Sequence, residues 1–199
     1  YRTSPRRRSC QSLTRQTCDH ISGAMSFRGV IEAMGGTHIR IQALPGQDQA
    51  YYHYKGFHSM LRLAVVDNCG MFRWVISGVP GSCGDRETLA RTDWLRRVEN
   101  EQELPDCECA MFPNGACILG GSAIAESTYI RALFSIPDTR DERFFNNKHS
   151  SMRMRVEHAL GRFKWKFPAL NDGLMFSSAH CPVIINASVV LYNFILVHE

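Results

Sequence analysis

Two long apolar runs separated by a tight turn constrain the fold of this chain more than any other feature. The runs Phe57–Asp67 and Met71–Ser77 are rich in apolar, β-branched and aromatic residues, and the turn Asn68-Cys69-Gly70 lies between them. This pattern is typical of an antiparallel β-hairpin. A third strand-like run, Val30–Ile41, precedes it. We therefore predict three antiparallel strands in the first half of the chain.

The second half of the chain alternates between helical and strand-like patterns. We predict a helix over Asp85–Asn100, a short buried strand over Ala116–Leu119, a helix over His149–Phe167 and a last apolar helix over Cys181–Val197. The Gly/Pro-rich segment Gly78–Ser82 is expected to break the sheet before the first helix. This order of elements predicts a mixed α/β domain.

Length and composition fit an ordinary globular domain. The chain has 199 residues, of which 44% are hydrophobic and 21% charged, and these values exclude a disordered, collagenous or coiled-coil protein. The longest apolar stretch, Val183–Val197, contains Asn186, Ser188 and Asn193. We interpret it as a buried helix, too short and too polar to span a bilayer, and expect no membrane contact. The opening at Tyr1, with no secretory signal, suggests a fragment or a mature piece.

Positive charge is concentrated in two segments. Residues 1–15 hold five Arg and no acid, and residues 148–166 hold six Lys or Arg against one Glu. Such segments suggest a polyanionic partner, and a soluble protein with a basic tail is an equally open interpretation. We predict that residues 1–25 are a basic tail or the remnant of an upstream element, and that residues 26–199 form the domain.

The eight cysteines are scattered, which favours a reduced intracellular protein over a disulfide framework. Cys107-x-Cys109 followed by Cys117 could hold zinc, but the spacing lacks the usual pair of two-residue gaps and no His is close in sequence. Buried or loop thiols are the default expectation, and the sequence does not decide the role of these three residues.

Seven short strings carry a resemblance to a known family. They are Gly36-Thr37-His38-Ile39, Lys55-Gly56-Phe57-His58-Ser59, Ala64-Val65-Val66-Asp67, Gly78-x-Pro80-Gly81-Ser82-x-x-Asp85, Ile118-Leu119-Gly120, Asn146-x-x-His149-Ser150-Ser151 and Val156-Glu157-x-Ala159-x-Gly161-Arg162-x-Lys164. In this order, over residues 27–199, the chain resembles the DDE endonuclease domain of PIF/Harbinger transposases and of proteins domesticated from them. The resemblance implies an RNase H-like fold, in which three antiparallel strands, a helix and a parallel strand are flanked by helices.

The resemblance also implies a specific metal chemistry. Domains of this family cut and join DNA with two divalent ions, magnesium or manganese, held by two Asp and one Glu. The matching positions here are Gly35, Gly121 and Glu157, with 35 residues between the last two. Because glycine has no side-chain oxygen, only Glu157 remains as a metal ligand. We therefore expect a degenerate site with no bound cofactor and no cleavage or strand transfer.

Four acids are candidates for replacing or retaining a metal ligand near these positions. Asp85 matches an acid in the family's loop before the helix and could touch a metal, but an N-cap role for that helix is the preferred interpretation. Glu157 itself has a structural interpretation as the partner of Arg153, four residues earlier. Glu32 is three residues from Gly35 and should point to the opposite face of the strand. Asp67 ends a different strand.

Basic side chains are the stronger candidates for nucleic-acid binding. Phosphate contacts give affinity that falls with salt and carries little sequence information, and no element for base readout is recognisable. A solvated helix face is the alternative. The candidate residues are Lys55, Arg153, Arg155, Arg162, Lys164 and Lys166.

These observations lead to three functional hypotheses. The first is a non-catalytic nuclear scaffold, associated with DNA or chromatin, that has a separate DNA-binding or chromatin protein as partner and no small-molecule ligand. The second is an active metal-dependent nuclease with an unconventional ligand set such as Asp85 and Glu157. The third is an inert relic that folds poorly. Restoring Asp at Gly35 and Gly121 is expected to recover metal binding if the scaffold is sound.

Overall fold

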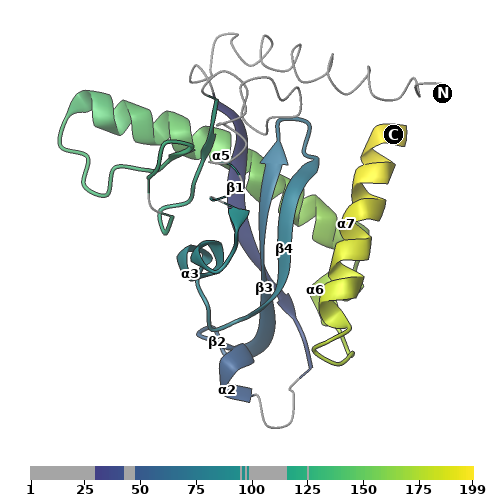
Figure 1. The fold of residues 1–199 in the computed structure, drawn as a ribbon. Coiled ribbons are helices and arrows are strands. Elements are labelled where there is room, and N and C mark those ends of the chain that lie inside the picture. Colours follow the sequence, from purple (N-terminus) through teal and green to yellow (C-terminus); the bar gives the residue numbers. More distant parts are fainter. Residues whose placement is uncertain (1–29, 43–47, 95, 97, 99–115, 125) are drawn as a thin grey trace.

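The apolar runs build one mixed β-sheet in the computed structural model of the chain, which describes residues 30–42, 48–94, 96, 98, 116–124 and 126–199 (Figure 1). The sheet is six-stranded, with the order β2-β3-β1-β5-β6 and with β4 paired to β3. The strands are β1 (Val30–Arg40), β2 (Tyr52–His53), β3 (Phe57–Asp67), β4 (Phe72–Pro80), β5 (Cys117–Leu119) and β6 (Ile130–Arg131).

The strand directions agree with the predicted pairing. β1, β3 and β4 are antiparallel neighbours, whereas β5 runs parallel to β1 and β6 runs parallel to β5. The hairpin turn after Asp67 is closed by hydrogen bonds from Asp67 N to the Met71 carbonyl and from Gly70 N to the Asp67 carbonyl. Gly70 has a positive φ of 83°, which glycine adopts without strain. The mixed α/β class is therefore confirmed.

Helices cover both faces of the sheet because β1 and β3 alternate two sets of apolar side chains. Ala33 and Ile39 of β1 join one cluster, which also contains residues of the helices α5 (Arg140–Lys166), α6 (Ala169–Asp172) and α7 (Cys181–His198). Met34 of β1 joins a second cluster with Leu89 of α3 (Asp85–Ala90). The short helix α2 (Asp48–Tyr51) directly precedes β2. Period-two alternation thus places one core on each side of the sheet.

Two side chains fix α5 and α7 to the sheet. The carboxamide of Asn193 in α7 accepts a hydrogen bond from Phe72 N at 2.9 Å and donates one to the Phe72 carbonyl at 2.8 Å. The Arg62 guanidinium of β3 is fully buried between the rings of Phe72 and Phe163, 4.2 and 4.1 Å from their centroids. Both contacts join the start of β4 to the helical layer.

Three predicted boundaries are wrong. The predicted helix Asp85–Asn100 is interrupted: α3 ends at Ala90, and Trp94, Arg96 and Val98 are helical again. At the break, the Thr92 hydroxyl donates to the Leu89 carbonyl and accepts from Trp94 N. The sheet does not break at Gly78, because β4 continues to Pro80 through a register shift, with Gly78 at a positive φ of 91°. α5 begins at Arg140, nine residues before the predicted start.

The start of α5 rests on a local polar motif. Thr139 is the N-cap and accepts from Glu142 N, while the Glu142 carboxylate accepts from Thr139 N. This capping box needs no apolar periodicity, and the first turns of the helix are polar. The pattern Thr139-x-x-Glu142 was therefore the signal in the sequence that could have located the boundary.

The last helix is confirmed in position but is not a buried helix. One side of α7 packs against β4 and α5, and the opposite side is exposed. Within the described residues, α7 is also the one helix long and apolar enough to cross a membrane by length and composition, with 18 residues and a mean hydropathy of 1.7. The expectation that this segment is too short and too polar therefore does not hold for the whole helix.

Some predicted features lie outside the described residues. These are the basic tail over residues 1–25 and the pair Cys107 and Cys109. Cys117 is described and is a buried free thiol in β5. Burial raises its pKa, and the neighbouring Arg131 opposes that shift.

Candidate functional site

Gly35 and Gly121, which the sequence resemblance places at the family's Asp positions, lie on β1 and just after β5, which are neighbouring parallel strands. Ala33 of β1 pairs with Leu119 of β5, and Gly35 and Gly121 each follow two residues later. Both glycines are buried. The parallel register therefore brings the two positions to the same level of the sheet.

Both positions face one stretch of α5. A Cβ atom added at Gly35 would lie 3.1 Å from Val156 Cγ1 and 3.9 Å from Leu160 Cδ1. A Cβ atom at Gly121 would lie 3.6 Å from Arg153 Nη1. The third family position, Glu157, is on the same turns of this helix, so the three positions lie around a single segment of α5.

Glu157 forms an ion pair with an arginine of its own helix. Arg153 Nη2 donates to Glu157 Oε1 at 2.6 Å, and 52% of the Glu157 side chain is exposed. The space beside it is open, because a Cβ atom at Gly161 would have no neighbour within 4 Å. The structural interpretation of Glu157 as the partner of Arg153 thus describes a real contact.

Asp85 lies beside this segment but does not cap a helix. The N-cap of α3 is Gly84, and Asp85 is the first helical residue, so the predicted N-cap role is wrong. Its carboxylate contacts Gly36, in the space that a side chain there would need. Burial raises the Asp85 pKa, and the positive charge of Arg153 opposes the shift. An acid in the first turn of a helix also interacts favourably with the helix dipole.

This arrangement does not fit a site for two divalent ions. Such ions need several carboxylate oxygens, and the two glycines supply none. Glu157 shares one oxygen with Arg153, which leaves Asp85 as the additional acid in reach of the same guanidinium. Over the described ranges, no group of three His, Cys, Asp or Glu side chains could hold a metal ion.

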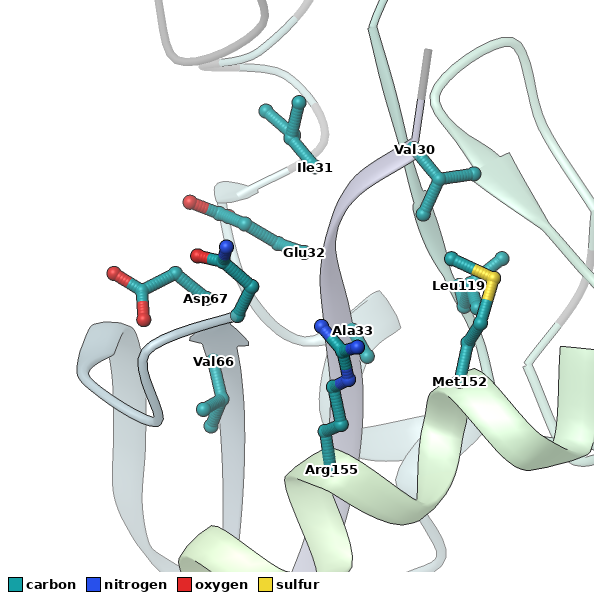
Figure 2. Close-up of a pocket in the computed structure, with 10 residues that line it drawn as sticks. Val30, Ile31, Glu32, Ala33, Val66, Asp67, Leu119, Met152 and Arg155 are labelled. Carbon is teal, nitrogen blue, oxygen red and sulfur yellow. The ribbon is translucent and has the colours of Figure 1, made fainter. Parts of the chain in front are cut away.

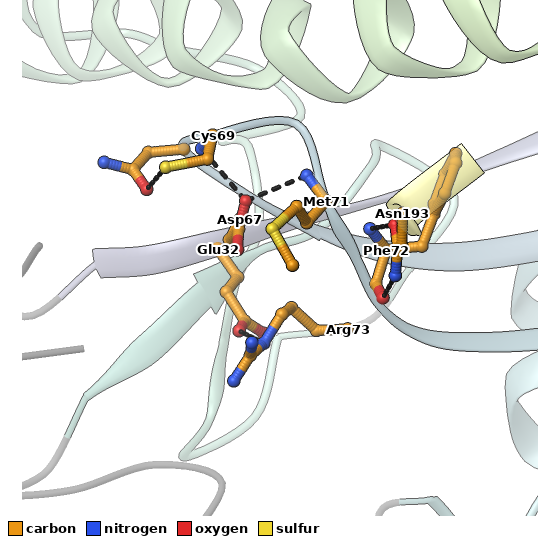
Figure 3. Close-up of polar contacts among 8 residues, drawn as sticks. Glu32, Asp67, Cys69, Met71, Phe72, Arg73 and Asn193 are labelled. Carbon is orange, nitrogen blue, oxygen red and sulfur yellow. Dashed lines mark hydrogen bonds and ion pairs between the residues drawn. The ribbon is translucent and has the colours of Figure 1, made fainter. Parts of the chain in front are cut away.

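Glu32 and Asp67 form a separate acidic cluster at the hairpin. Glu32 and Asp67 are direct partners across β1 and β3 (Figure 3). Glu32 Oε1 lies 3.7 Å from Arg73 Nε, and Asp67 Oδ1 accepts from Cys69 N and Met71 N, each at 2.9 Å. The Asp67 hydrogen bonds stabilise the hairpin turn, and the Glu32–Arg73 ion pair joins β1 to β4.

Burial is the main cause of the raised pKa of Glu32 in this cluster. The Glu32 side chain is 9% exposed. Burial raises the Glu32 pKa to about 7, the Arg73 charge opposes this, and the Asp67 charge adds to it. The hollow that both acids line with Met152 and Arg155 has a volume of about 30 Å³ (Figure 2). This hollow is large enough to hold water molecules.

The basic residues predicted to bind nucleic acid differ in exposure and in their partners within the chain. Arg155 and Arg162 are exposed on α5, and Lys55 is exposed in the turn between β2 and β3, 5.8 Å from the centroid of the Tyr54 ring. The other three have partners within the chain. Arg153 pairs with Glu157, Lys166 pairs with Glu199, and Lys164 donates to the His38 carbonyl at 2.6 Å.

Lys164 in addition is half-buried. Burial is the largest cause that lowers its pKa, followed by the charges of Arg62 and Arg40. Its ammonium group thus serves a backbone carbonyl of β1. Of the six predicted residues, Lys55, Arg155 and Arg162 have the most accessible charges.

A hollow that the sequence did not predict lies beside β1. It has a volume of about 380 Å³ and is lined by His38, Tyr52, His53, Tyr54, Gly81, Ser82, Cys83 and Gly84. The ring centroids of His38 and His53 are 3.9 Å apart, and His38 Nδ1 is 3.1 Å from Ser59 Oγ. Burial, followed by the charges of His53, Lys164 and Lys55, lowers the His38 pKa to about 4.

The hollow extends the same face of β1 that contacts Asp85. His38 follows Gly36 by two residues, so the two positions share one side of the strand. The strings Gly36-Thr37-His38-Ile39 and Lys55-Gly56-Phe57-His58-Ser59 were noted in the sequence. The sequence did not predict that the two strings line one hollow. The strand β2, which contributes Tyr52 and His53 to that hollow, is only two residues long and shows no apolar periodicity.

Comparison with known proteins gives the class. Residues 34–193 match the DDE superfamily endonuclease family, which is more than half of the chain. The chain therefore belongs to the DDE superfamily endonuclease family.

The individual relatives are proteins named "Putative nuclease HARBI1". The chain is 28% identical to the mouse protein and 27% identical to the human protein over 183 residues, which is 90% of this chain and 50% of each relative. It is 23% identical to the frog Xenopus laevis protein over 195 residues. The chain thus spans about half the length of the curated relatives it matches, which are Harbinger transposase-derived. No solved structure matches the chain.

Proposed function

We propose that this chain is a degenerate DDE endonuclease domain with an RNase H-like fold, which has lost metal-dependent DNA cleavage and keeps non-specific affinity for DNA. One observation carries the proposal. The two positions that face α5 at the level of Glu157 are glycines, so neither can give an oxygen to a cation. The remaining Glu157 carboxylate already accepts a hydrogen bond from Arg153.

The loss of catalysis is tested by a nicking assay on supercoiled plasmid DNA with Mg²⁺ or Mn²⁺. The parent chain is expected to leave the plasmid intact at every metal concentration that an active family member uses. Glu157→Ala is the matched control, because contaminating nuclease activity would be equal in both preparations. Nicking by the parent that Glu157→Ala abolishes would contradict the proposal.

Such activity would support the second candidate, a nuclease that uses Asp85 and Glu157. The observation that favours it is that the Arg153 charge interacts with both acids, which places them around one guanidinium. Asp85→Asn separates the two candidates. It should abolish activity if Asp85 is a ligand, and there should be no activity to abolish if the domain is non-catalytic.

DNA affinity is proposed to come from the exposed cations Lys55, Arg155 and Arg162. Each phosphate contact contributes about 0.9 to the slope of log affinity against log salt concentration. Arg155→Ala and Arg162→Ala should each lower that slope by about 0.9 in a fluorescence-anisotropy titration with duplex DNA of any sequence.

Arg91→Ala is the matched control for these variants. Arg91 is an exposed arginine at the end of α3, paired with Glu87, so its removal changes the net charge equally but away from α5. It should leave the slope unchanged. Equal slopes for the parent and all three variants would contradict the proposal that Arg155 and Arg162 contact phosphates.

A nuclear, chromatin-associated role with a separate DNA-binding or chromatin protein as partner completes the proposal. It rests on the absence, among the described residues, of an element suited to major-groove readout, since sequence specificity then has to come from another protein. Imaging and chromatin fractionation of the tagged chain test this. A chain that stays in the cytoplasm, or that is fully extracted from nuclei at low salt, would contradict it.

A further inference from the structure

The outer side of α7 carries an apolar surface that no described element covers. Its large side chains are each 54–69% exposed: Val183, Val190, Leu191, Phe194 and Val197. The inner side of the same helix is buried and includes Cys181, Ile185, Val189 and Tyr192. In Figure 1, α7 runs along the edge of the molecule beside β4. The exposed residues are named the α7 outer face below.

The spacing of the α7 outer face is that of a helix-pairing seam. Val183, Ala187, Val190, Phe194 and Val197 follow one another by steps of four, three, four and three residues, and all five are exposed. Apolar residues with this alternation form the a and d positions through which two helices interlock side chains. A helix that only covers the core of its own domain needs such a stripe on one side, and α7 has one on each side.

The α7 outer face contains no charge that would oppose contact between two copies. The sequence from Cys181 to Val197 has no Asp, Glu, Lys or Arg. Five side chains that are more than half exposed, one of them aromatic, offer on the order of 500 Å² of apolar surface. Two copies would together bury roughly 1,000 Å², which is about the threshold for a specific interface.

We propose that the α7 outer face is a self-association surface through which two copies of this chain pair. Twofold symmetry brings the same seam onto itself, so one patch satisfies both partners. The attachment of α7 to its own domain favours this occupant over a lipid bilayer. Its inner face is packed on β4 and α5, and Asn193 binds both backbone groups of Phe72, so only one side of the helix is available.

Sedimentation equilibrium of the 199-residue chain between about 1 and 200 μM tests the proposal, because interfaces below about 1,200 Å² are typical of weak association. The parent should reach twice the 22.6 kDa mass of one chain as concentration rises. Phe194→Glu and Val190→Glu should each weaken the dimer at least 100-fold, since they place a charge in the seam of both copies. Their melting curves should match the parent, because both residues are exposed.

Phe144→Glu is the matched control. Phe144 is 61% exposed on α5 and Phe194 is 62% exposed, so the two substitutions change the same residue type at equal exposure. The Phe144 variant should dimerise as the parent does. A parent that stays monomeric at 200 μM, or a Phe194→Glu variant that dimerises normally, would overturn the proposal. Binding of the monomeric parent to neutral phosphatidylcholine vesicles, lost in Phe194→Glu, would assign the face to a membrane surface instead.

Discussion

An acid at Gly35 should destabilise the domain strongly, whereas an acid at Gly121 should change its stability little. Gly35→Asp puts a carboxylate against the inner face of α5, where its Cβ atom would lie 3.1 Å from Val156 Cγ1 and close to Leu160. A Cβ atom at Gly121 would lie 3.6 Å from Arg153 Nη1, so Gly121→Asp puts a carboxylate beside that guanidinium. The first site is crowded and apolar, and the second offers a cation.

The magnitudes follow from these surroundings. At Gly35 the crowding costs about 1–3 kcal/mol, and keeping a carboxylate in an apolar site costs about 1.4 kcal/mol for each unit by which its pKa rises. A total of about 4 kcal/mol is expected, and it is offset by about 0.5–1 kcal/mol because glycine weakens a strand. At Gly121 the new pair with Arg153 should keep the change within about 1 kcal/mol.

Urea and thermal denaturation of the two single variants, followed by circular dichroism, measure the difference. One kcal/mol corresponds to about 2–4 °C in Tm for a domain of this size, so Gly35→Asp should melt roughly 10 °C below the parent and Gly121→Asp within about 4 °C of it. Gly35→Ala controls for crowding without charge and should fall between them. Equal stability of Gly35→Asp and the parent would refute the placement of Gly35 against α5.

Three further substitutions test other parts of the structure. The folded chain keeps the Glu32 proton up to a pKa of about 7, while the unfolded chain releases it near 4.5. The free energy of unfolding therefore falls as pH rises between these values, and Glu32→Gln should be more stable than the parent at pH 8 by about 2–3 kcal/mol. Thr139→Ala should cost about 1 kcal/mol by removing the capping box of α5. Asn193→Ala leaves two backbone groups of Phe72 unpaired and should cost about 2–3 kcal/mol.

Each of these has its own control in urea denaturation. Glu126→Gln, at an exposed ion pair, should show no such gain at pH 8. Ser150→Ala, exposed in the middle of α5, should be neutral or slightly stabilising, in contrast to Thr139→Ala. Asn186→Ala, on the exposed side of α7, should change stability by less than about 0.5 kcal/mol. A loss equal to that of Asn193→Ala would show that the Phe72 contacts carry no special weight.

The parts of the fold that the sequence predicted are those that bury apolar side chains in a regular pattern. The strand Phe57–Asp67 was located correctly because it is buried on both faces and ends at a turn with glycine. The start of α5 was missed because Arg140–Lys148 is polar except for the adjacent Phe144 and Phe145, so it shows no helical apolar periodicity and its start is marked by the capping box. The interruption after Ala90 was missed because a single Thr92 side chain bond causes it.

Some features of the candidate site could be predicted from the sequence, and others could not. Family strings predicted Gly35, Gly121 and Glu157 as site positions, and the parallel pairing of β1 with β5 brings the two glycines against the segment of α5 that carries Glu157. The bond from Lys164 to the His38 carbonyl could not be predicted, because it depends on how deeply the helix sits against the strand. The same limit applies to the inner and outer faces of α7, since sequence spacing alone does not say which of its two apolar stripes packs on the domain.

The direct measurement for the loss of the metal site is a titration of the parent chain with Mn²⁺, followed both by calorimetry and by paramagnetic broadening of backbone amide signals. We predict no binding heat at micromolar concentrations and no selective broadening at Gly35, Gly121 or Glu157. Micromolar binding with broadening centred on these three residues, and its disappearance in Glu157→Ala, would contradict the conclusion that this domain has lost its metal site.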